Sequence, residues 1–136
     1  MSDEFILVSA EDGASLRFSF DHSTPGYITV AAEGRGFRVV APVYTYMSPP
    51  LPTFFDDLAG GDFHETASTV WESIEGELRL EASRDLLGHI FMVFYLRSPD
   101  IGSNRWWSFT GRMVLELGSM QLHCKRVREF WNVAGA

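Results

Sequence analysis

The chain has 136 residues, of which 46% are hydrophobic and 21% charged, so it is long enough to bury the core of one compact domain. Its longest apolar run, residues 90–96, is far shorter than the roughly 18 to 20 residues of a transmembrane helix, which excludes a membrane-spanning helix. The acidic start of the chain is unlike a signal peptide, and a single cysteine, Cys124, forms no internal disulfide. We therefore expect residues 1–136 to form one cytoplasmic domain.

Negative charge is concentrated in one part of the chain. Nine acidic and two basic residues lie within residues 56–85, and this difference equals the whole net charge of −7. An acidic surface repels phosphates, whereas nucleic-acid binders carry a basic stripe. The tight basic cluster Lys125, Arg126 and Arg128 falls in the last turns of an expected helix, where cations complement the helix dipole. We therefore expect no nucleic-acid ligand.

The first forty-odd residues alternate in the manner of short strands separated by turns. The expected strands are residues 5–9, 16–20, 27–32 and 37–41, and Pro42 ends the last of them or lies at a sheet edge. This pattern predicts a β-meander. Apolar residues then recur at helical spacing over residues 51–58, between prolines and a Gly-Gly pair, which predicts a short amphipathic helix. Residues 62–69 follow neither period and are expected to form a surface loop.

A hairpin follows the loop. Residues 74–82 alternate between apolar and charged side chains, which predicts one strand with a core face and a wet, acidic face. Residues 85–88 supply the turn. Residues 90–96 are apolar on both faces, which is typical either of a central strand, our preferred interpretation, or of an apolar patch on the open face.

The last two elements are a long strand and a helix. Residues 107–117 share an apolar face, and Gly111 permits a bend or bulge in this strand. Ser119 is a reasonable N-cap for a helix whose apolar stripe includes a buried Cys124 in a plain packing role. Together the elements predict an α+β domain: a curved antiparallel sheet of about seven strands in meander order, with two helices packed on one face.

The sequence offers few groups for chemistry. Its four histidines have no metal-binding spacing, and no nucleophile elbow or phosphate-binding loop is present. His89 follows the hairpin turn, where it is a turn residue, a partner for Asp85 or a general base. We therefore predict no catalytic residue, no metal and no cofactor, and we lean away from an enzyme.

Three segments carry a resemblance to a known family. They are the block Trp71-Glu72-Ser73-Ile74-Glu75-Gly76-Glu77-Leu78-Arg79-Leu80, then Asp85 with Gly88-His89-Ile90, and Leu115-Glu116-Leu117-Gly118 before the final helix. With these segments the chain resembles a bacterial domain family of unknown function. That family is similar in strand pattern to immunity proteins that neutralise contact-dependent toxins. The resemblance covers about the last two-thirds of the chain and implies a fold rather than functional residues.

Two functions from different classes follow. The first is a non-catalytic, immunity-type protein-binding module whose acidic strand face meets a basic protein such as a toxin domain. Its candidate binding residues are Glu75, Glu77, Arg79, Glu81, Asp85 and His89. The alternative is a small-molecule-binding domain or unrecognised enzyme, with a pocket between sheet and helices around Trp71, Tyr95 or His89. A homodimer formed through an exposed edge strand is a third alternative. The glutamates also have a purely structural interpretation, as the wet face of an amphipathic strand.

Overall fold

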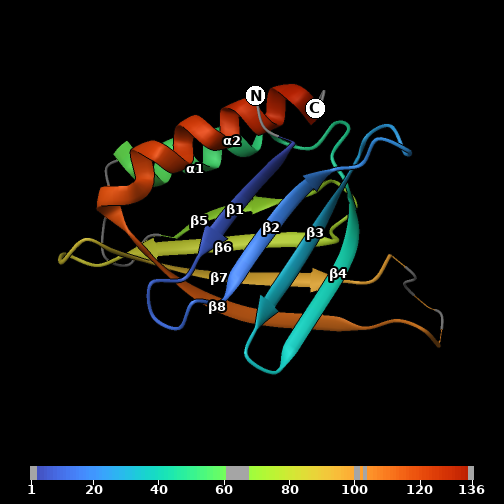
Figure 1. The fold of residues 1–136 in the computed structure, drawn as a ribbon, viewed down its shortest axis with the longest axis horizontal. Helices are drawn as coiled ribbons and strands as arrows, with labels where there is room; N and C mark the ends of the chain where they lie inside the picture. The colour runs from blue at the N-terminus through green and yellow to red at the C-terminus, as the bar shows by residue number, and fades with distance from the viewer. Residues whose placement is uncertain (1–2, 61–67, 100–101, 103, 135–136) are drawn as a thin grey trace.

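The computed structural model describes residues 3–60, 68–99, 102 and 104–134 of the chain. Within them, eight strands form two four-stranded antiparallel sheets, and two helices pack against each other (Figure 1). The strands of the first sheet, in spatial order, are β1 (Glu4–Val8), β2 (Ser15–Phe20), β3 (Tyr27–Gly34) and β4 (Phe37–Tyr44). Those of the second are β5 (Thr69–Glu72), β6 (Leu78–Arg84), β7 (His89–Arg97) and β8 (Ser108–Glu116). The helices are α1 (Leu51–Gly60) and α2 (Met120–Ala134), with a 3-10 turn, η1 (Leu117–Ser119), before α2.

The two sheets are stacked, and their strands cross one another in the view of Figure 1. Helix α1 contacts β5, whereas α2 contacts β1 and β2. Because β1 and β5 are edge strands, the helix pair lies along the side of the stack that these two edges border. Among the described residues, no helix is long and apolar enough to span a membrane.

The prediction of an α+β domain with antiparallel strands and two helices is confirmed, but that of one curved sheet of about seven strands is wrong. Alternation in a strand shows that one of its faces is buried without showing what buries it. Here α1 stands between β4 and β5 in the chain, and the strands after it form a second sheet. The buried faces of both sheets then share one core.

Side chains from both sheets and both helices meet in that core. Phe5 of β1 packs edge-on against Phe55 of α1 with ring centroids 5.3 Å apart. Trp71 of β5 packs edge-on against Trp131 of α2 at 6.4 Å. These aromatic pairs add specific geometry to the burial of apolar area that holds the layers together. The Trp71 Nε1–H also donates to the carbonyl of Pro49 (2.8 Å), and so ties β5 to the segment that enters α1.

Both predicted helices are present, but Ser119 is not the N-cap of α2. Its hydroxyl donates to the carbonyl of Glu116 (2.8 Å), and the chain enters α2 through the η1 turn. Cys124 is buried as predicted, and its thiol donates to the carbonyl of Phe55 (3.4 Å) in α1. The predicted loop over residues 62–69 lies mostly outside the described residues, and its last residue opens β5.

Candidate functional site

Strand β7 has one buried face and one exposed face. Ile90, Met92, Phe94 and Leu96 point into the core, whereas Phe91, Val93 and Tyr95 project to the other side. Phe91 and Tyr95 are each 37% exposed. Both sequence interpretations of residues 90–96 therefore apply, since β7 is central in its sheet and also carries an apolar column on the outer face of that sheet. We call the side of the second sheet that bears this column its outer face.

The strand register sets the neighbours of this column. Tyr95 pairs with Arg79 of β6 and Thr110 of β8, and Val93 pairs with Glu81 and Arg112. Directly opposite residues of an antiparallel sheet project from the same face. Charged and polar side chains therefore line both sides of the apolar column.

Arg79 is the centre of the interactions on the β6 side. Its guanidinium lies 3.7 Å from the carboxylate of Glu72 and 3.6 Å from that of Glu81, and its central carbon lies 5.6 Å from the centroid of the Tyr95 ring. Each of these exposed contacts contributes little to stability, of the order of 1 kcal/mol or less. Together they orient Arg79 and partly neutralise the acidic face that the sequence predicted.

The prediction of one strand over residues 74–82 is wrong, because β5 ends at Glu72 and β6 begins at Leu78. Between them Gly76 has φ = +77°, a backbone conformation that favours glycine and turns the chain. Glu75 lies exposed in this turn, and its carbonyl accepts a hydrogen bond from the guanidinium of Arg97. The predicted set Glu75, Glu77 and Glu81 is therefore not one row on a strand, and only Glu81 lies on the outer face.

Glu77 is buried, with 3% of its surface exposed. Its carboxylate accepts hydrogen bonds from the hydroxyl of Ser73 (2.9 Å) and from the backbone N–H of Tyr44 (2.9 Å). The Ser73 hydroxyl oxygen in turn accepts from the N–H of Leu78 (3.2 Å). This predicted binding residue is thus placed inside the protein, where it joins β4 to the second sheet. No local sequence signal announces the contact, because Tyr44 lies 33 residues earlier.

Asp85 and His89 hold the turn between β6 and β7. One Asp85 oxygen accepts the N–H groups of Leu87 and His89, each at 2.9 Å, and the other lies 3.0 Å from His89 Nδ1. The N–H of His89 is the main cause that lowers the pKa of the Asp85 carboxyl. The side-chain hydrogen bond to Asp85 raises the pKa of His89. Of the three sequence alternatives for His89, a turn residue, a partner for Asp85 or a general base, this geometry matches the partner for Asp85, and His89 itself is the first residue of β7.

The turn that Asp85 closes presents two exposed leucines. Leu86 and Leu87 are 83% and 82% exposed, more than any other large hydrophobic residue that the structure describes. They lie at the tip of the hairpin whose second strand carries Phe91 and Tyr95. We call the apolar residues Leu86, Leu87, Phe91, Val93 and Tyr95 the hairpin surface. Sequence analysis found β7 but missed the leucines, which it assigned to the turn without a role.

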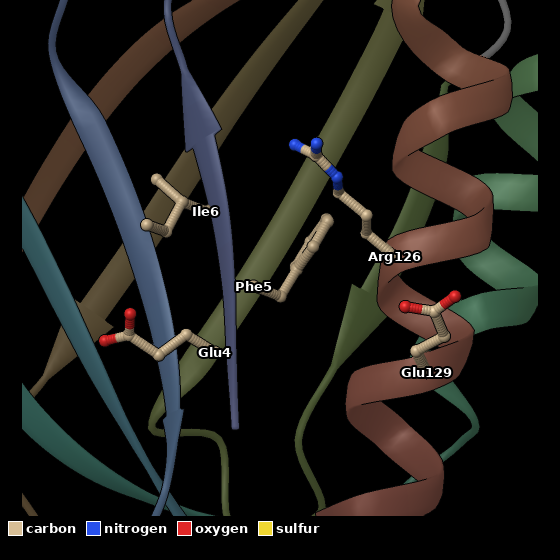
Figure 2. A pocket seen from close by; sticks show the side chains of 5 residues that line it. All are labelled: Glu4, Phe5, Ile6, Arg126 and Glu129. Atoms are coloured by element: carbon tan, nitrogen blue, oxygen red, sulfur yellow. The ribbon is translucent and has the colours of Figure 1, made fainter. Parts of the chain in front are cut away.

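The structure does not bring together Trp71, Tyr95 and His89, the residues around which the sequence analysis placed a pocket. Trp71 is in the core, Tyr95 is on the outer face of the second sheet, and His89 stands beside its turn. A cavity of about 320 Å³ does open between the first sheet and a helix, but it lies between β1 and α2 (Figure 2). Within the described residues, no group of three or more His, Cys, Asp or Glu side chains could hold a metal ion.

The fold and the site define a two-sheet α+β domain with an exposed apolar hairpin. The chain belongs to a family described as Family of unknown function (DUF6228), whose pattern it matches over residues 7–134. This match confirms a domain of unknown function, and it covers almost the whole chain. No curated protein matches the chain.

Proposed function

We propose that this chain is a non-catalytic protein-binding module of immunity type, and that it docks through the hairpin surface onto a basic protein such as a toxin domain. The observation that carries the proposal is the exposure of four apolar residues along one hairpin, Leu86, Leu87, Phe91 and Tyr95, with the half-buried Val93 between the two aromatic residues. Single exposed hydrophobic residues are normal in folded proteins, but a continuous apolar strand column with two leucines at its end is typical of an interaction surface. Aromatic anchors such as Phe91 and Tyr95 supply much of the binding energy at protein interfaces.

The hairpin surface is preorganised for binding. Asp85 fixes the turn that carries the leucines, and Arg79 packs over Tyr95. A surface that is already ordered loses less conformational entropy on association. This rigidity supports a docking role for residues that contribute little to the core.

Charge supports a basic partner. Glu72, Glu81 and Glu116 project from the outer face around the apolar column, and the whole chain has a net charge of −7. Opposite charge on a partner accelerates association and selects among competitors. Arg79 and Arg112 on the same face form ion pairs with Glu81 and Glu11.

The test uses two double variants and one matched control. Leu86→Ser/Leu87→Ser removes the apolar tip and Phe91→Ser/Tyr95→Ser the aromatic column, whereas Val40→Ser changes a residue of the first sheet that is also 37% exposed. Each tagged protein is used to capture proteins from a lysate of its own organism, and the recovered proteins are quantified by mass spectrometry. Titration calorimetry with the purified partner then measures affinity.

We expect a basic protein in one-to-one ratio with the wild type and the Val40 variant, and a loss of at least about tenfold in affinity for both double variants. Equal affinity in all four proteins would show that the hairpin surface is not the docking site. Capture of no protein above background would contradict the binding-module proposal itself. A dimer of the wild type that both double variants disrupt would replace the basic partner with a second copy of this chain.

A further inference from the structure

We propose that the cavity between β1 and α2 binds an extended peptide segment of another protein, which adds as an antiparallel strand to the free edge of β1. The segment presents an acidic side chain to Arg126 and, two residues later, a basic side chain to Glu129. This site is built by the first sheet and α2, and so does not depend on the hairpin surface of the second sheet.

The cavity is bordered on one side by a strand edge. It has a volume of about 320 Å³ and is lined by Glu4, Phe5 and Ile6 of β1 and by Arg126 and Glu129 of α2. Figure 2 shows the side chains of Glu4 and Ile6 turned away from α2, and those of Phe5 and Arg126 pointing into the gap. The backbone of β1 at Ile6 therefore faces the cavity directly.

Hydrogen bonding in the first sheet leaves that backbone available. The N–H of Phe20 donates to the carbonyl of Asp3 (3.0 Å), and the N–H of Ser9 donates to that of Ala14 (2.7 Å). In an antiparallel pair, residues alternate between those that bond the neighbouring strand and those that point away from it. Because residues 3 and 9 bond toward β2 and its turn, the N–H and C=O groups of Ile6 and Val8 point to the free edge.

The opposite edge of the same sheet is protected. The N–H of Thr45 donates to the carbonyl of Gly26 (2.8 Å), so by the same alternation Pro42 and Tyr44 face the free edge of β4. Pro42 has no N–H, and the N–H of Tyr44 donates to Glu77 (2.9 Å). Proline and covering contacts are the devices that proteins use to block strand addition at an edge. Strand β1 contains no proline, so its edge keeps a backbone donor at Ile6 where β4 has lost one.

Helix α2 determines what fits beside β1. If β1 of a second copy paired with β1 of the first, β2 of the second copy would come next to it in the extended sheet. That position is on the side of the cavity where α2 of the first copy already lies. A single extended segment requires only one strand position. The geometry between β1 and α2 therefore favours a peptide over a dimer, by the β-strand addition that other peptide-binding domains use.

The charges on α2 set the chemistry of the segment. Arg126 and Glu129 are three residues apart and so lie on the same face of the helix, with Arg126 nearer Ile6 and Glu129 nearer Glu4 in Figure 2. Alternate side chains of a strand share a face and are separated by about 6.6 to 6.8 Å. An antiparallel segment runs from the Ile6 end toward the Glu4 end, so it places an acid first and a base two positions later.

The test is a titration of the ¹⁵N-labelled full chain with the capped heptapeptide Val-Thr-Asp-Val-Lys-Thr-Val, in which the central valine pairs with Ile6. The matched peptide Val-Thr-Lys-Val-Asp-Thr-Val exchanges the two charges. Exposed ion pairs are each worth roughly threefold to fivefold in affinity, so we expect the exchanged peptide to bind about tenfold more weakly. We expect the Arg126→Glu/Glu129→Arg protein to reverse this preference. The amide chemical shifts of Ile6 and Val8 should change progressively as peptide is added and then reach a plateau.

A second pair of peptides tests the backbone contact without changing the protein. N-methylation of the central valine removes the N–H that faces β1, whereas N-methylation of the aspartate alters an N–H that points away from it. We expect the first change to weaken binding at least about tenfold and the second to have little effect. Equal effects of the two methylations would overturn strand addition. An unchanged preference in the charge-exchanged protein, or no shift of Ile6 and Val8 with either charged peptide, would overturn the proposal.

Discussion

The carboxylate of Glu77 accepts the backbone N–H of Tyr44 at 2.9 Å, across the boundary between the two sheets. One residue just before β6 thus accepts a hydrogen bond from a backbone donor on the free edge of β4. The same carboxylate accepts the hydroxyl of Ser73 (2.9 Å), which orders the turn before β6. A side chain that resembles a solvent-facing glutamate in the sequence is therefore a link between two layers of the fold.

Removal of this carboxylate should destabilise the protein strongly. Glu77→Ala leaves the N–H of Tyr44 and the hydroxyl of Ser73 buried without their acceptor, and we expect the free energy of unfolding to fall by about 3 kcal/mol. Urea denaturation of Glu77→Ala, with Glu75→Ala as the exposed neighbouring control, measures the difference. The control should change stability by less than about 0.5 kcal/mol. An equal loss of unfolding free energy in the two variants would show that Glu77 stabilises the protein no more than the exposed Glu75 does.

Gly111 of β8 lies directly opposite Phe94 of β7, and its lack of a side chain makes room for that ring. A Cβ at this position would clash with the Phe94 ring, because several ring carbons would lie closer to it than van der Waals contact allows. Since Phe94 is in the core, Gly111→Ala should force the ring to move and cost about 1 to 3 kcal/mol of stability. Thermal and urea denaturation of the variant measure this cost.

A double-mutant cycle identifies the cause of that loss. If the Phe94 ring is what the new methyl group meets, Gly111→Ala should cost much less in a Phe94→Leu background than in the wild type. Equal costs in both backgrounds would place the strain elsewhere. The bend or bulge that the sequence indicated at Gly111 is replaced here by a packing role, because β8 pairs with β7 without a break over the whole strand.

The individual strands and helices follow from local patterns. The four strands of the N-terminal meander, the hairpin strand β7 and both helices come from periodicity and from Gly and Pro punctuation, which report local structure. The division into two sheets does not follow, since side-chain alternation is the same whether a helix or a second sheet buries the strand face.

The candidate site was only partly predictable for a related reason. Arg79, Glu81, Asp85 and His89 lie near the positions that the hairpin pattern indicates, since their neighbours are set by strand register. Glu77 was misplaced because the turn at Gly76 separates it from β5 and β6 begins only at Leu78, so strand alternation does not predict where its side chain lies. The edge of β1 beside α2 has no sequence signature at all, because residues more than 100 positions apart build it.

Cys124 should be unreactive in the folded protein. Burial raises the pKa of its thiol to about 11, from an ordinary value of 9.0, and a thiolate is the reactive species. The thiolate fraction at pH 8 is therefore about a hundredfold lower than that of a free cysteine, and burial limits access further. Absorbance assays with a disulfide reagent should show slow labelling in buffer and rapid labelling in denaturant. Rapid labelling of the folded chain would contradict the packing role.

The Asp85–His89 pair should make stability depend on pH. His89 has a raised pKa in the folded protein, so its contribution is fully present below its unfolded value of 6.5 and is lost as the pH rises through the folded pKa. Asp85 has a lowered pKa, so its contribution is present above its unfolded value of 3.8 and is lost as the pH falls through the folded pKa. The pair therefore stabilises the turn most between these two unfolded values.

Asp85→Asn tests this linkage at a single atom. The amide oxygen can still accept the N–H groups of Leu87 and His89, but the negative charge beside His89 Nδ1 is gone. NMR titration should give His89 a lower pKa in this variant than in the wild type. The control is Glu116→Gln, because the carboxylate of Glu116 lies 4.0 Å from His89 Nε2. This variant should lower the pKa of His89 less than Asp85→Asn does. If the wild type loses no stability relative to Asp85→Asn between pH 6 and pH 8, the ion pair does not hold the turn, and the exposed leucines at its tip need another source of order.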